Sequence, residues 1–81
     1  MDENLHAVET FIRDLFDEYS GPVTRQLTAK DVRQWDSLGH VQLMVAIEQA
    51  FGIRFNSNEV RKFANVGELV DAIAGKKAAK G

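Results

Sequence analysis

One serine in this 81-residue chain stands where a covalent modification is favoured. Ser37 lies between Asp36 and Leu38, at the start of an apolar-patterned run that ends at Phe51. Apolar residues recur in this run at spacings of three and four, which predicts a helix. The unpaired N–H groups and the dipole at a helix start favour an exposed anion by about 0.3 to 1 kcal/mol. A phosphodiester on Ser37 would therefore lie in a favourable position.

The same residues also allow a purely structural explanation. Asp and Ser are both common helix caps, so either could be present only to satisfy an unpaired backbone N–H. Gly39 stands three residues after Asp36, where a capping box would need Glu or Gln. The local pattern alone leaves two hypotheses open for Ser37, a modification site and a cap.

A catalytic or metal site is not predicted. His40 follows Ser37 by about one helical turn, so a Ser/His pair is conceivable. The sequence offers no orienting acid at a suitable spacing and nothing that resembles an oxyanion hole. The acids of the first helix lack His or Cys partners and the oxygen-rich loop that calcium requires. We expect no catalytic residue and no metal ligand.

Composition argues against several other functions. The net charge is -2 and the cations are scattered, which argues against nucleic-acid binding. The absence of cysteine excludes disulfides and thiolate nucleophiles, so any thiol chemistry must come from another molecule. No signal peptide and no continuous apolar span are visible, so we expect a cytoplasmic protein without a membrane span.

The periodicity predicts an all-α fold, a small four-helix bundle of three main helices and one short helix. A first helix is expected over residues 5–19, where Gly21-Pro22 ends it, and a second over residues 38–51. Residues 23–36 between them show no clean period. We expect a long ordered loop there, held by its apolar residues.

The second half of the chain predicts the remaining two helices. A short third helix should follow the caps near Asn56 and run through Phe63, and Asn65 should cap the last helix. Residues 1–74 are expected to form one monomeric domain, because a chain this short supports only one modest core. Residues 75–81 are expected to form a flexible, solvated tail.

The run Asp36-Ser37-Leu38-Gly39-His40-Val41-Gln42-Leu43-Met44 resembles the acyl carrier proteins. The similarity continues through Phe51-Gly52-Ile53-Arg54-Phe55 and Asn65-Val66-Gly67-Glu68-Leu69 to Ile73, and so covers most of the chain. It implies that a separate transferase attaches 4'-phosphopantetheine from coenzyme A to Ser37 through a phosphodiester. The terminal thiol of this arm would carry acyl groups as thioesters, and the chain itself would not be an enzyme.

The resemblance also implies roles for other residues. Asp36 matches the motif acid that the transferase recognises, and Leu38 matches the apolar contact of the motif. The residues expected to recognise the transferase and other partners, such as acyl-loading and synthase-type enzymes, are Asp36, Leu38, Gly39, His40, Val41, Met44, Glu48 and Glu59. The positions that match the family's acyl pocket are Ile47, Phe55, Val60 and Phe63. Three of these four look bulkier than usual, so we expect a shallower pocket.

Departures from the family pattern indicate a specialised carrier. Carriers of general fatty-acid synthesis usually have acids at the positions of Gly39, Gln42, Gln49, Ala50, Ser57 and Arg61. Because charge steers partner encounter, a less acidic face predicts partners that use more apolar and polar contacts. The pathway could be of the fatty acid, lipid or polyketide type. The alternatives are an amino-acid or peptidyl carrier and, in another class, a helical protein-interaction module in which Ser37 is only a cap.

Overall fold

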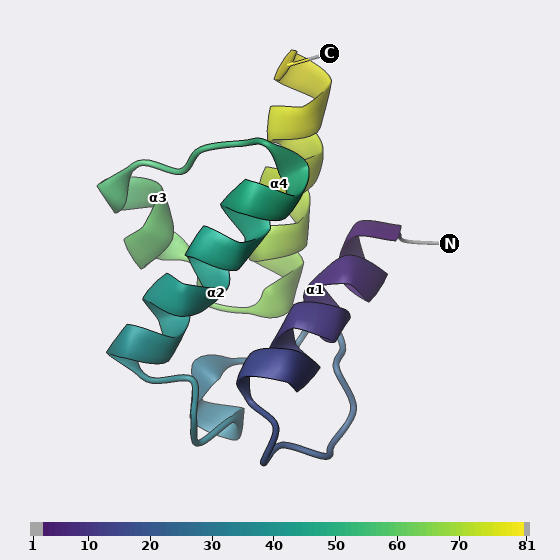
Figure 1. Cartoon of the computed structure of the whole chain (residues 1–81), viewed down its shortest axis with the longest axis vertical. Helices are drawn as coiled ribbons and strands as arrows, with labels where there is room; N and C mark the ends of the chain where they lie inside the picture. The colour runs from purple at the N-terminus through teal and green to yellow at the C-terminus, as the bar shows by residue number, and fades with distance from the viewer. Residues whose placement is uncertain (1–2, 81) are drawn as a thin grey trace.

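The computed structural model describes the backbone of residues 3–80 and the side chains of residues 3–77. The helices are α1 (Glu3–Leu15), the 3-10 helix η1 (Ala29–Asp31), α2 (Ser37–Phe51), α3 (Ser57–Lys62) and α4 (Val66–Lys80). Helix α1 packs against both α2 and α4, and the short α3 lies beside α2 on the side opposite α1 (Figure 1). Residues 3–80 contain no strand. The expected all-α fold of three longer helices and one short helix is confirmed.

Helix α1 ends at Leu15, four residues earlier than the apolar pattern predicts. The N–H of Glu18 donates to the side-chain oxygen of Gln34 at 2.8 Å, which draws the chain away from a helical path. The Tyr19 hydroxyl then donates to the Pro22 carbonyl at 2.7 Å. The apolar period continues past the helix because Phe16 still packs into the core, where its ring stacks on Trp35 at 5.9 Å.

The loop between α1 and α2 is ordered, as expected, and it anchors the start of α4. Leu27, Val32 and Trp35 are buried in the core, and η1 forms the middle of the loop. The first N–H groups of α4 donate to loop carbonyls: Val66 to Leu27 at 2.9 Å and Gly67 to Arg25 at 2.8 Å. The loop therefore satisfies helix-start N–H groups that would otherwise lack partners.

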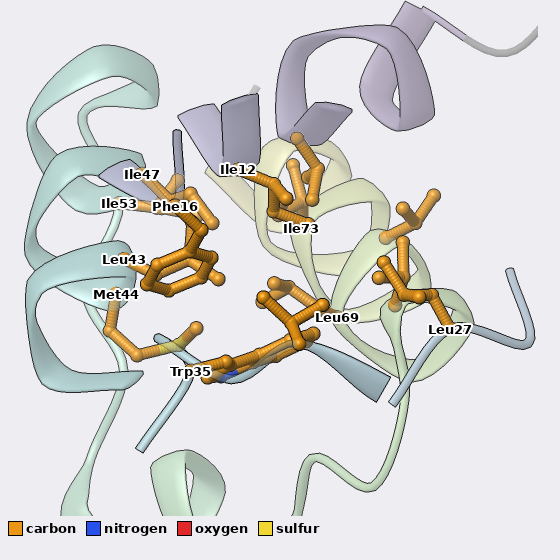
Figure 2. Close-up of a cluster of buried hydrophobic side chains, with 14 residues drawn as sticks. Ile12, Phe16, Leu27, Trp35, Leu43, Met44, Ile47, Ile53, Leu69 and Ile73 are labelled. Carbon is orange, nitrogen blue, oxygen red and sulfur yellow. The ribbon is translucent and has the colours of Figure 1, made fainter. Parts of the chain in front are cut away.

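The core is one apolar cluster that all three longer helices share. Figure 2 shows Ile12 from α1, Leu43 and Ile47 from α2, and Phe16 and Trp35 from the segment between these helices, together with other buried side chains. No buried side-chain nitrogen or oxygen among the described residues lacks a hydrogen-bond partner. No helix within residues 3–80 is long and apolar enough to cross a membrane.

Helix α4 continues to Lys80, although we expected a solvated tail from residue 75. The side chain of Lys76 pairs with Glu59 at 3.0 Å, and Lys77 donates to Asn4 at 3.0 Å. Alanine and lysine are also good helix formers, which outweighs the single Gly75. The end of α4 therefore does not coincide with the domain boundary expected at residue 74, and Gly81 lies outside the described residues.

Candidate functional site

Ser37 is the first residue of α2, and its side chain is exposed. The residue that caps the helix is Asp36, whose Oδ1 accepts a hydrogen bond from the Gly39 N–H at 2.8 Å. The Asp36 carbonyl accepts the N–H of His40, also at 2.8 Å. The Ser37 hydroxyl makes no hydrogen bond to another residue of the described part of the chain. Capping does not explain Ser37, and its hydroxyl is accessible to a reactant.

Gly39 is buried and has a packing role. A Cβ at this position would lie 2.4 Å from the Gln34 carbonyl oxygen and 2.9 Å from the Phe16 ring. The first turn of α2 therefore lies so close to the loop that only glycine fits. Gly39 was expected to take part in partner recognition. In the structure this residue is buried and faces the interior of the protein.

His40 connects the loop, α2 and α3 through both of its ring nitrogens. The Trp35 Nε1–H donates to His40 Nδ1 at 2.8 Å, so the remaining ring proton lies on Nε2. That Nε2–H donates to the Val60 carbonyl oxygen of α3 at 2.7 Å. The Trp35 and His40 rings also stack, with centroids 6.0 Å apart. Within the fold, His40, which was expected to recognise partners, holds α3 beside the first turn of α2.

This arrangement does not support a Ser/His pair. Both nitrogens of His40 have partners other than Ser37, so neither is available to take the Ser37 proton. No group of three or more His, Cys, Asp or Glu within the described residues could hold a metal ion. What the site offers to chemistry is the exposed hydroxyl of Ser37.

Two shallow grooves meet beside α3. The first, the serine groove, has a volume of about 390 Å³ and is lined by Ala29, Trp35, Asp36, Ser37, His40, Val60, Arg61 and Phe63. The second, the α2–α3 groove, has a volume of about 420 Å³ and is lined by Val41, Met44, Val45, Glu48, Phe55, Ser57, Val60 and Arg61. Val60 and Arg61 line both grooves. A flexible group attached at Ser37 could reach the apolar α2–α3 groove by passing these two residues.

Three of the four expected pocket residues line the two grooves, and the fourth lies in the core. Phe55 and Val60 line the α2–α3 groove, and Phe63 lines the serine groove. Phe55 and Phe63 contact each other edge to face, with ring centroids 5.3 Å apart. Ile47 is 0% exposed within the core and lines neither groove. The structure brings Phe55, Val60 and Phe63 together around α3 and leaves Ile47 behind them.

The two acids expected to recognise partners are both used inside the protein. Glu48 accepts the Phe55 N–H at 2.7 Å. Glu59 accepts the Asn56 N–H at 2.9 Å and pairs with Lys76 at 3.0 Å. The Asn56 N–H and then the Lys76 ammonium hold the pKa of Glu59 below its ordinary value. Both carboxylates thus have internal partners, and Lys76 balances the charge of Glu59, whereas Glu48 keeps its negative charge beside the α2–α3 groove.

Helix α2 is apolar on its outer face as well as on its buried face. Leu38 is 67% exposed, Val41 is 51% exposed and Val45 is 43% exposed. Met44, by contrast, is buried, although it lines the α2–α3 groove. Val45 was not among the expected site residues. Val45 lies seven residues after Leu38 and four after Val41, a spacing that places the three side chains on one face of the helix. Because α2 is apolar on nearly all sides, the sequence did not distinguish this exposed face from the buried one.

Arg61 is another groove residue that was not expected to form part of the site. Its sequence neighbours give no sign of contact with Ser37, because the two lie on different helices. The hydrogen bond from His40 to Val60 brings the helices together, and only the folded arrangement shows it.

Comparisons with known proteins show similarity over the part of the chain that contains Ser37. Residues 35–73 match a family model described as the phosphopantetheine attachment site. An acyl carrier protein of Acidothermus cellulolyticus is 46% identical over 39 residues, which make up 48% of this chain and 46% of that relative. The chain thus spans about half the length of this curated relative.

A solved structure extends the similarity over the fold. The solution NMR structure of a holo acyl carrier protein from Geobacter metallireducens matches with a TM-score of 0.86 and 39% identity. The match covers 95% of this chain and 88% of that one. The chain therefore belongs to the acyl carrier protein family, whose members are carriers rather than enzymes and whose prosthetic group is a covalently attached 4'-phosphopantetheine.

Proposed function

We propose that this chain carries acyl groups as thioesters on a 4'-phosphopantetheine arm that is joined to Ser37 through a phosphodiester. The observation that carries the proposal is the division of roles at the start of α2. Asp36 caps the helix, so the adjacent Ser37 hydroxyl is exposed beside a groove and has no structural role. The interaction-module alternative requires Ser37 to be the cap, and the position of Asp36 disfavours it.

The residues present fit the arm. The Ser37 oxygen would displace adenosine 3',5'-bisphosphate from the pyrophosphate of coenzyme A and lose its proton to the transferase. The arm would supply the thiol that this cysteine-free chain lacks. The exposed Leu38 and Val41 would contact the transferase and later partners, because large apolar side chains on a surface favour association. Asp36 would assist by holding the first turn of α2 in its helical form.

The cargo would lie along the α2–α3 groove. Its apolar lining by Val41, Met44, Val45, Phe55 and Val60 suits a hydrocarbon chain. Phe55 and Phe63 occupy space around α3, and Ile47 fills the core behind the groove. We therefore infer a shallow site that leaves the distal part of a long acyl chain exposed. Amide shifts measured on carriers loaded with increasing acyl lengths would contradict this if core residues shifted progressively through long chains.

A specialised pathway suits the charge of the docking face. Glu48 and Glu59 have internal partners, so the apolar side chains of α2 are the main features offered to synthase-type and acyl-loading enzymes. We place the carrier in the cytoplasm with the coenzyme A-dependent transferase, as a monomer. An amino-acid or peptidyl cargo is the alternative within this class, and the loading enzyme would distinguish the two.

The test is intact mass before and after incubation with coenzyme A and a broad-specificity phosphopantetheinyl transferase. We expect one arm per chain, located on the Ser37 peptide, and none on Ser37→Ala. Ser57→Ala is a matched control, because Ser57 is also an exposed first residue of a helix, after the cap Asn56. This control should be loaded as the wild type is. An unchanged wild-type mass with a competent transferase, or equal loading of Ser37→Ala, would refute the proposal.

A further inference from the structure

The serine groove contains one cation that has no role in the fold described so far. Arg61 lines this groove together with Ser37, and its residue is exposed. Among the described residues, its guanidinium makes no hydrogen bond or ion pair. Arg13 and Lys76, by comparison, pair with Glu9 and Glu59. Arg61 is therefore available to an anion that enters the groove.

The position of Arg61 is determined by the contact between α2 and α3. His40 lies one turn after Ser37, and its Nε2–H donates to the Val60 carbonyl at 2.7 Å. Arg61 follows Val60 directly in the chain, so this bond holds it next to the first turn of α2. The edge contact between Phe55 and Phe63 further restrains the ends of α3. Arg61 thus lies in a groove wall whose distance from Ser37 is maintained by the fold.

The start of α2 alone does not neutralise an anion on Ser37. The Gly39 N–H is already bonded to the Asp36 carboxylate at 2.8 Å, so this helix-start donor is occupied. The Asp36 carboxylate also lines the serine groove and would repel a second negative group nearby. A cation nearby would therefore add to the stabilisation that the remaining helix-start N–H groups give a phosphodiester on Ser37. Arg61 is the cation that lines this groove.

We propose that Arg61 binds the phosphodiester of the arm on Ser37 and holds the proximal part of the arm in the serine groove. The inference rests on the proposed function, because Ser37 must carry the arm. A planar guanidinium can donate two parallel N–H groups to two phosphate oxygens, which fixes orientation as well as charge. Because Arg61 also lines the α2–α3 groove, this contact would direct the rest of the arm towards the apolar lining there.

The test compares the protein before and after arm attachment, with a free thiol and no cargo, so that the phosphodiester is the new anion. Complete attachment is first verified by intact mass. The Arg61 Nε–Hε resonance should then shift between the two forms, and the shift should diminish at high salt. The Arg54 Nε–Hε resonance should remain in place, because Arg54 lies on a different groove with Glu48 and Ile53.

Substitutions at Arg61 allow the same contact to be observed from the phosphate, through its phosphorus-31 resonance. The phosphorus-31 resonance of fully loaded Arg61→Gln should shift away from that of the wild type and towards that of the unfolded loaded protein. Arg61→Lys, which keeps the charge, should restore part of the difference. Lys62→Gln is the matched control, because Lys62 is also an exposed cation of α3 but lines neither groove. It should keep the wild-type resonance.

The outcomes separate this inference from the carrier function. A wild-type chain that gains no mass refutes the carrier function. A loaded wild-type chain with an unchanged Arg61 Nε–Hε resonance overturns the phosphodiester contact and leaves the carrier function intact. If that resonance moves only after a carboxylate-bearing acyl group is loaded, the contact with the phosphodiester is also overturned, and the cargo is the anion.

Discussion

Helices α2 and α3 begin with the same local pattern, a polar cap followed by an exposed serine. In each, the cap side chain accepts a hydrogen bond from the backbone N–H three residues later. The Gly39 N–H donates to Asp36 at 2.8 Å, and the Glu59 N–H donates to Asn56 at 2.9 Å. At α3 the Glu59 carboxylate returns a bond to the Asn56 N–H at 2.9 Å, so a capping box completes this start. At α2 glycine occupies that position, and the loop packs against it. The two helix starts therefore differ at the third residue after the cap. Glu59 completes a capping box at α3, whereas Gly39 allows the loop to pack against α2 beside Ser37.

The largest effect on the difference between the two helix starts should come from adding a methyl group at Gly39 in α2. Gly39→Ala places a Cβ 2.4 Å from the Gln34 carbonyl oxygen, so the backbone of the loop or of the helix must move. We expect the free energy of unfolding to fall by about 3 kcal/mol, the upper part of the usual range for overpacking. Chemical denaturation measures this change. The comparison is Gly75→Ala, where a Cβ meets no atom within 4 Å and stability should be retained or increased.

A smaller effect should follow from separating the two helix starts. His40→Phe keeps a ring but removes the partners of the Trp35 N–H and of the Val60 carbonyl. Trp35 is buried, so leaving its N–H unsatisfied should cost about 2 kcal/mol of unfolding free energy. The substitution should also accelerate amide hydrogen exchange in α3 more than in α4, relative to the wild type. His40→Gln, whose amide can both accept and donate, should recover part of the loss, and equal stability of His40→Phe and wild type would contradict the proposed link.

The two caps should contribute equally to stability and unequally to function. Asp36→Ala and Asn56→Ala each remove one bond to a helix-start N–H, so each should lower the free energy of unfolding by about 1 kcal/mol. Only Asp36→Ala alters the turn that carries Ser37. Its initial rate of arm attachment should fall, whereas Asn56→Ala should be loaded at the wild-type rate. Equal loading rates for the two variants would show that the α2 cap does not assist the transferase.

The same contrast explains which features the sequence could predict. The starts of α2, α3 and α4 follow from local caps and apolar spacing, and they were predicted within about one residue. The end of α1 depends on Gln34, sixteen residues beyond Glu18, and the extent of α4 depends partly on Glu59 and Asn4. These contacts join distant parts of the chain, and no local pattern encodes them.

The site divides in the same way. Ser37 could be identified because its type and its place at a helix start are local properties. The inward orientation of Gly39 and the complete burial of Ile47 depend on how α2 packs, and periodicity alone did not separate its two apolar faces. Arg61 joins the serine groove only because His40 bonds to a carbonyl twenty residues away. Local sequence therefore located the residue that we propose to be modified, and the tertiary structure located its surroundings.

The smallest expected effect lies in the capping box of α3, and it depends on pH. The Asn56 N–H and then Lys76 lower the pKa of Glu59 in the folded protein. A carboxyl with a depressed folded-state pKa stabilises the fold fully above its unfolded pKa, about 4.3 for glutamate. That stabilisation is lost as the pH falls through the lower folded-state value. Solvent screening of this partly exposed group keeps the effect small.

Glu59→Gln should therefore be less stable than wild type at neutral pH, and the difference should diminish as the solution is acidified below about pH 4. Thermal unfolding of both proteins across this range, at low and high salt, measures the difference. The high-salt curves should lie closer together, because salt weakens the attraction between Glu59 and Lys76. A constant difference at all pH values would mean that hydrogen-bond geometry, and not the charge of Glu59, stabilises the start of α3. In that case charge would not contribute to the contrast between the two helix starts.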